Sequence, residues 1–447
     1  MCSQQQLADQ DIQAWMAFQE CSVALEEEQL AVELRSRSRD QESAFSGDYD
    51  YIMDASRFEE IVRLFFRVCL KHAVSYQVQQ RSAFKRRVVV FGSAGQSILF
   101  EFWPHAELTT NIPSKGWSFL PYKRFAQAYE GGLKEETLAL LFVCHLFFKK
   151  KDLSSSQVQW RLGDFSGRMG GVVEQRGEHA SFAAEIQQLF SGIIEGKFTL
   201  SEANKMALSL LDQKKIQVEG SGAAKWSQIR AKAKGPFRGW GGKVVPCVGP
   251  DGSGKTYFIE AVMEMVEKYS LKAGTVRFKK LFRKNIIYSL VSKRFRRPRG
   301  LQKNIADEQL ASFLYWVALP SYCWQVLKSL NKKVVFMDRF FLEFMVRGYR
   351  EDKGQGLDQI LGYSMLCWLI PEPRRMIVLT ADHALITSRK AELSAEAIQD
   401  FYSRYISYVV GQKVSNVLFL NTHSSGDELA GSCLDLIGIL KKAKQKN

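Results

Sequence analysis

The chain has 447 residues, enough for two or three domains, and its content of 46% hydrophobic and 24% charged residues is ordinary for a globular protein. Its eight cysteines include no C-x-x-C pair, which argues against a zinc site or a disulfide framework and fits a reducing cytosol. The formal charge of +15 favours anionic partners. Neither a signal peptide nor a membrane span is expected, so the predicted location is the cytoplasm.

The first informative pattern is a pair of aspartates in residues 47–53 (GDYDYIM). Asp48 and Asp50 are spaced i and i+2, which places both on one face of a strand. A later apolar stretch, residues 98–103 (ILFEFW), carries Glu101 on a second predicted strand. Three such carboxylates can hold two metal ions for nucleotidyl transfer. The arrangement resembles the nucleotidyltransferase fold, whose motif is hG[GS], then DhDh, then a third carboxylate on a later strand.

One position departs from that motif. Ser36 lies at the expected distance ahead of Asp48, but Arg35 replaces the glycine that approaches phosphate closely. The resemblance therefore implies an α+β nucleotidyltransferase-like domain that is catalytically degenerate and serves acceptor binding or regulation. The alternative is a D-x-D turn with an unrelated buried glutamate.

Further elements are predicted between this pattern and the middle of the chain. Residues 88–91 and 97–103 are expected to form a hairpin, and residues 56–72, 134–150 and 178–215 are expected to be helical. Residues 218–242 are rich in Gly, Ala and Lys and lack periodicity, which indicates a basic linker. The predicted organisation is an N-terminal domain with a helical extension (residues 1–217), the linker, and a C-terminal domain (residues 243–447).

The most specific motif is the glycine-rich loop, defined here as residues 249–256 (GPDGSGKT), which matches G-x-x-x-x-G-K-[ST]. An apolar stretch precedes it like a buried strand, and residues 257–269 follow with helical periodicity. Lys255 is expected to be a loop charge outside the core that bridges the β- and γ-phosphates of ATP, while Thr256 holds Mg²⁺. The alternative is a turn that binds nothing. The predicted nucleotide site comprises Gly249, Asp251, Gly252, Ser253, Gly254, Lys255 and Thr256.

After the linker, short apolar stretches alternate with helical ones. Residues 244–248, 334–337, 376–379 and 417–420 are predicted strands of a parallel sheet with helices on both faces, an α/β fold. Residues 334–340 (VVFMDRF) end in Asp338 and Arg339, at the sheet edge that carries the glycine-rich loop. Asp338 is placed to orient Mg²⁺ and its waters, and Arg339 to clamp a phosphate.

These motifs, together with residues 377–409, resemble the thymidylate kinase family of nucleoside monophosphate kinases. The resemblance covers residues 243–445 and implies a P-loop kinase fold that uses ATP and Mg²⁺. By similarity, Asp251 helps to orient the acceptor, and Arg389 and Lys390 lie over the transferring phosphoryl group, where positive charge stabilises the transition state. The alternative for Arg389 and Lys390 is a solvated helix face.

Two departures argue against a thymidylate pocket. The family's T-R-E-P segment is replaced by residues 276–284 (VRFKKLFRK), and the helix before the D-R strand, residues 310–324, has no Arg or His. The chain looks closer to the thymidylate-kinase-like proteins encoded beside bacterial surface-polysaccharide genes. Residues 277–299, here called the basic block, hold ten Lys or Arg and no acid. Such a block attracts phosphates, anionic lipids, acidic glycans or nucleic acid, although it is also compatible with a solvated face.

The leading interpretation is an ATP- and Mg²⁺-dependent phosphotransferase. Its expected acceptor is an anionic glycan or glycolipid hydroxyl that docks on the basic block, which also allows peripheral contact with the anionic inner face of a membrane. One alternative is an ordinary nucleoside monophosphate kinase. The other, of a different class, is a nucleotide-binding regulatory module with little or no ATP turnover.

Overall fold

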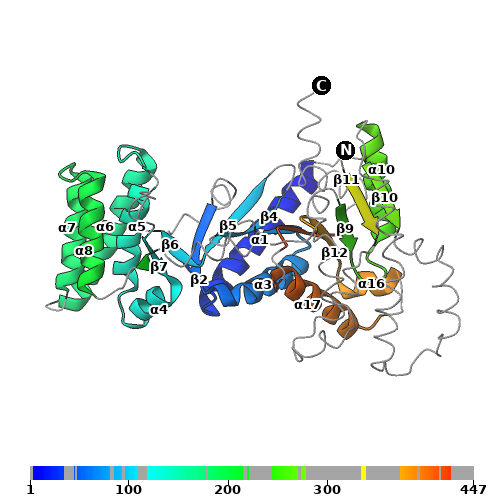
Figure 1. Ribbon diagram of the computed structural model, residues 1–447, viewed down its shortest axis with the longest axis horizontal. Helices are drawn as coiled ribbons and strands as arrows, with labels where there is room; N and C mark the ends of the chain where they lie inside the picture. Colours follow the sequence, from blue (N-terminus) through cyan, green and yellow to red (C-terminus); the bar gives the residue numbers. More distant parts are fainter. Residues whose placement is uncertain are drawn as a thin grey trace.

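The computed structural model describes residues 4–34, 45, 48–80, 85–92, 96–107, 118–148, 150–177, 180–214, 219–220, 244–269, 273–277, 334–338, 373–389, 393–411 and 414–423. Arg35, Ser36, Arg339, Lys390 and all of the basic block except Arg277 lie outside these residues, as does most of the predicted linker. Within them, a large mixed sheet with helices on both faces confirms the α/β class (Figure 1).

The main sheet has ten strands and runs through both halves of the chain. In spatial order the strands are β1 (Ala31–Glu33), β2 (Asp48–Met53), β5 (Ser97–Trp103), β4 (Arg86–Phe91), β3 (Tyr76–Gln79), β13 (Asn416–Asn421), β12 (Met376–Thr380), β9 (Val244–Val248), β11 (Val334–Asp338) and β10 (Ala273–Arg277). The last five pair in parallel, which confirms the predicted C-terminal sheet and its four predicted strands. The predicted hairpin is also confirmed, as the antiparallel pair β4 and β5.

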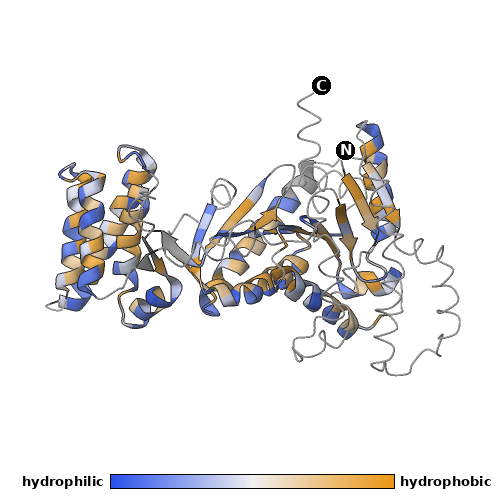
Figure 2. Ribbon diagram, viewed as in Figure 1, coloured by the Kyte–Doolittle hydropathy of each residue, from blue (hydrophilic) through white to orange (hydrophobic). Residues whose placement is uncertain are grey.

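Helices cover the parallel strands on both faces because these strands are apolar on both sides (Figure 2). On one face, α10 (Lys255–Lys268) packs on alternate residues such as Leu418 and Leu420. On the other, α17 (Ala395–Gly411) joins a core that includes Val417 and Phe419. The same core extends under α3 (Phe58–Lys71) and α1 (Gln4–Glu27), so both halves of the chain share it.

Strands β3 and β13 join the two halves by antiparallel pairing from Tyr76 opposite Phe419 to Gln79 opposite Asn416. The rings of Tyr76 and Phe419 stack with centroids 4.6 Å apart. Beneath the sheet, Ser407 of α17 donates to Glu59 of α3 at 2.6 Å. The sequence indicated two domains and a linker but not this continuity, because the pairing of distant strands leaves no local pattern.

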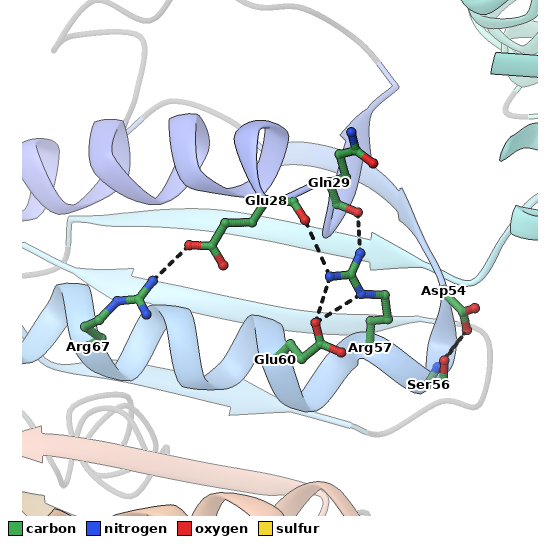
Figure 3. Close-up of polar contacts among 7 residues, drawn as sticks. All are labelled: Glu28, Gln29, Asp54, Ser56, Arg57, Glu60 and Arg67. Atoms are coloured by element: carbon green, nitrogen blue, oxygen red, sulfur yellow. Dashed lines mark hydrogen bonds and ion pairs between the residues drawn. The ribbon is translucent and has the colours of Figure 1, made fainter. Parts of the chain in front are cut away.

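The end of α1 is fastened to the start of α3 by Arg57, which lies in the short helix η1 (Ala55–Arg57) (Figure 3). Its guanidinium donates to the carbonyl oxygens of Gln29 at 2.7 Å and Glu28 at 3.4 Å, and to the Glu60 carboxylate at 2.7 Å. A cationic side chain thus pairs with two carbonyls of the turn that follows α1. Nearby, Arg67 contacts only the exposed side chain of Glu28 among the residues drawn in Figure 3.

A bundle of helices forms a separate core at one end of the molecule (Figure 1). It consists of α4 (Tyr122–Glu130), α5 (Lys134–Phe148), α6 (Ser156–Arg176), α7 (Ser181–Ile194) and α8 (Leu200–Gln213), which confirms the helices predicted over 134–150 and 178–215. A small sheet of β6 (His105–Glu107), β7 (Ser118–Pro121) and β8 (Glu219–Gly220) adjoins it, so the start of the predicted linker is still paired. The short helix α16 (His383–Arg389) lies between β12 and α17 in the chain. Among the helices that the structure describes, none has the length and apolar character needed to cross a bilayer.

Candidate functional site

The glycine-rich loop leaves the carboxyl end of β9, which lies between β11 and β12 in the parallel sheet. From β9 the chain continues to β10 on one side, whereas from β12 it continues to β13 on the other. Connections that leave neighbouring strands in opposite directions open a crevice at the carboxyl edge, where α/β folds bind ligands. The loop therefore stands at the switch point of this sheet.

Glycine is required in the loop for two different reasons. Gly252 and Gly254 have φ of 96° and 84°, a conformation that other residues rarely adopt. At Gly249 the constraint is close approach instead, because a Cβ would lie 2.4 Å from Ser253 Oγ and 3.1 Å from the carbonyl oxygen of Leu379. The loop is consequently pressed against the end of β12.

Lys255 is the first residue of α10, and its side chain folds back over the loop. Its Nζ donates to the carbonyl oxygens of Gly249 at 2.6 Å and Pro250 at 2.7 Å, and lies 3.7 Å from Asp251 Oδ1. The residue is only 7% exposed, so the prediction of a loop charge outside the core is wrong. The ammonium group can be buried because two backbone carbonyls of the loop accept hydrogen bonds from it.

Two other predicted residues come close to this loop. Asp338 ends β11 directly opposite Cys247 of β9, which places it at the same edge of the sheet. Arg389 ends α16, and its Nη1 lies 3.5 Å from the point that a Cβ on Gly254 would occupy. Arg389 is therefore beside the loop, whereas Arg339 and Lys390 lie outside the described residues.

The donors gathered here suit an anion with several oxygens. The first backbone N–H groups of α10 have no acceptor within the helix, and the helix end carries partial positive charge. Ser253 Oγ is buried without a hydrogen-bond partner, and Thr256 is exposed on the first turn. Together with the ammonium of Lys255, this set fits the phosphates of a nucleotide and a bound Mg²⁺.

Asp382 and His423, which were not predicted as site residues, follow β12 and β13 at the same edge of the sheet. Asp382 Oδ1 accepts from the N–H of Leu385 at 2.7 Å and so caps α16. Its Oδ2 lies 3.0 Å from Nε2 of His423, which ties the start of this helix to the end of β13. A usable signal was present, since each residue comes three positions after the end of a predicted buried strand.

The three N-terminal carboxylates also converge, as predicted. Strands β2 and β5 pair in parallel with Asp50 opposite Glu101, and one oxygen from each of Asp48, Asp50 and Glu101 lies within 4.8 Å of the other two. Asp50 is 2% and Glu101 3% exposed. The spacing of these oxygens is compatible with a metal ion.

Two cations that the sequence analysis did not single out lie against this cluster. Lys85 forms an ion pair with Glu101 Oε2, and Arg87 Nη2 lies 2.7 Å from Glu101 Oε1. Trp103 Nε1 donates to Asp50 Oδ1 at 3.0 Å, and its ring lies 4.6 Å from Lys85 Nζ. The cluster thus combines carboxylate oxygens that could bind a metal with side chains that already contact them: Lys85 and Arg87 at Glu101, and Trp103 at Asp50.

The amino-acid sequence matches no protein-family model and no curated protein. The functional interpretation therefore rests on the geometry of the two clusters.

Proposed function

We propose that the chain is an ATP- and Mg²⁺-dependent phosphotransferase with a P-loop fold like that of nucleoside monophosphate kinases. The observation that carries this proposal is the position of the glycine-rich loop, between a central buried strand and a helix N-terminus at the switch point of a parallel sheet. Phosphates bind at such places because backbone N–H groups and the helix dipole both point at the anion.

Each neighbouring residue has a role in this proposal. The backbone of the loop holds the phosphates, and Lys255 exchanges its carbonyl acceptors for β- and γ-phosphate oxygens. Thr256 and Asp338 would hold Mg²⁺, which when bound supplies positive charge to the phosphate chain. Arg389, beside Gly254, is placed to stabilise charge that develops on the transferred group.

The acceptor proposed here is a hydroxyl of an anionic glycan or glycolipid. The supporting observation is the charge of the basic block, which holds ten Lys or Arg and no acid and begins at Arg277, where β10 ends. Parallel strands β10 and β11 end at the same edge as the loop, so Arg277, the first residue of the block, lies at that edge. Its charge also suits peripheral contact with an anionic membrane surface.

The test uses the full chain in two steps. Calorimetric titration with a non-hydrolysable ATP analogue, with and without Mg²⁺, should show Mg²⁺-dependent binding that Thr256→Ala weakens. Transfer of label from γ-labelled ATP to an acidic oligosaccharide is then expected, with dTMP a poor acceptor. Efficient dTDP formation would favour the nucleoside monophosphate kinase instead. Binding without any phosphorylated product would favour the regulatory module, and absence of binding would refute the proposal.

A further inference from the structure

The N-terminal carboxylates carry an inference independent of ATP binding. Alternation along β2 places Tyr49 and Tyr51 in the core under α1 and α3, so Asp48 and Asp50 project from the opposite face of the sheet. Asp50 and Glu101 stand side by side there and are almost fully buried. Two buried carboxylates repel each other and lose hydration, so the arrangement requires compensating positive charge.

The chain itself provides that charge from the adjacent strand. Arg87 lies opposite Glu101 on β4, so Asp50, Glu101 and Arg87 form one row across three strands. Lys85 comes immediately before β4 and reaches the other oxygen of the same carboxylate. Both oxygens of Glu101 therefore have a cationic partner, and one oxygen of Asp50 accepts from the indole of Trp103.

A divalent ion would need the same oxygens and would bring the same charge of two. To bind Glu101 it would have to displace Lys85, Arg87 or both, while their positive charges opposed its approach. The resemblance to nucleotidyltransferases implies metal ions at this cluster, and the donor set here disagrees with that implication.

We infer that Lys85 and Arg87 are resident counter-ions that take the place of a divalent metal at Asp48, Asp50 and Glu101. The two cations offset most of the negative charge of the cluster, which does not catalyse metal-dependent nucleotidyl transfer. Removal of the two cations should then uncover a metal site, because Glu101 would lose both of its cationic partners beside two further carboxylates.

The experiment measures Mn²⁺ binding to the full chain by electron paramagnetic resonance, without nucleotide and with Thr256→Ala in every variant to weaken the other candidate site. The parent should show no specific Mn²⁺ site at the cluster. Lys85→Ala combined with Arg87→Ala should bind one Mn²⁺ with an affinity at least about tenfold higher than that of the non-specific binding seen in the parent. Addition of Asp50→Asn should abolish this gain.

The control is Arg86→Ala, which removes one positive charge, against two in the double variant, from the position between Lys85 and Arg87. Arg86 lies 4.6 Å from the ring centroid of Phe58 and donates to the carbonyl oxygen of Ala55, away from the cluster. It should create no Mn²⁺ site. An equal gain in this control would mean that only net charge matters, and would overturn the inference.

The parent protein decides the question even if the double variant fails to fold. A Mn²⁺ site in the parent that Asp48→Asn with Asp50→Asn removes would overturn the inference. Absence of that site, together with a thermal midpoint that Mn²⁺ does not raise, would support it.

Discussion

Lys255 donates a hydrogen bond of 2.6 Å from its Nζ to the carbonyl oxygen of Gly249, the residue that opens its own loop. The bond closes the glycine-rich loop on itself through the side chain at its far end. In the proposed function a nucleotide would offer phosphate oxygens in the same place, so Lys255 would change partners without being left unpaired. The same residue therefore contributes to stability and, in the proposed function, to phosphate binding.

Lys255→Ala should abolish phosphoryl transfer and also destabilise the fold, by about 1–3 kcal/mol, because two carbonyls lose a charged donor. Lys268→Ala is the matched control, since it removes the same charge from the exposed far end of α10. Nucleotide binding and urea unfolding of both variants test this. Undiminished ATP turnover in Lys255→Ala would contradict the proposed function.

Gly249→Ala should destabilise the protein by about 1–3 kcal/mol and weaken nucleotide binding, because the new Cβ meets Ser253 Oγ and a backbone carbonyl. The opposite sign is expected for Gly163→Ala in α6. Nothing lies within 4 Å of a Cβ built at Gly163. At an interior position of a helix, alanine is more stabilising than glycine by about 0.5–1 kcal/mol. Urea midpoints should move in opposite directions. A urea midpoint that Gly249→Ala leaves unchanged or raises would show that the loop is looser than its geometry indicates.

Arg57→Ala should cost about 1–3 kcal/mol, because it leaves the carbonyls of Glu28 and Gln29, in the turn after α1, without their charged donor (Figure 3). Arg67→Ala, which breaks an ion pair that is 67% and 48% exposed at its two side chains, should change stability by less than about 1 kcal/mol. Thermal or urea unfolding compares the two. Equal losses would mean that the guanidinium of Arg57 does not support the helix end.

Residues 243–447 expressed alone should aggregate, because removal of β3 leaves β13 as an unpaired apolar edge. The variant should also expose Phe419, which now stacks on Tyr76. Co-expression with residues 1–217 is expected to restore a discrete species in size-exclusion chromatography. A monomeric fragment that unfolds at the midpoint of the full chain would show that the two halves are independent.

The sequence by itself determined the local elements of this protein. Apolar runs identified β9, β11, β12 and β13, and the glycines of the loop identified a turn that needs unusual backbone angles. The i, i+2 spacing of Asp48 and Asp50, with Glu101 on a later strand, also predicted that three carboxylates meet. Such features depend on residues close in sequence. The order of apolar and polar residue types predicts which positions are buried, and glycine marks positions with unusual backbone angles.

Only the tertiary structure decided which distant groups meet. It paired β3 with β13, brought Arg389 to Gly254, buried Lys255 under its own loop and set Lys85 and Arg87 against Glu101. The same local sequence pattern is compatible with a charged side chain that faces solvent, a ligand or an opposite charge. The choice is made by strand register and by the need of each buried charge for a partner, and both depend on the whole folded chain.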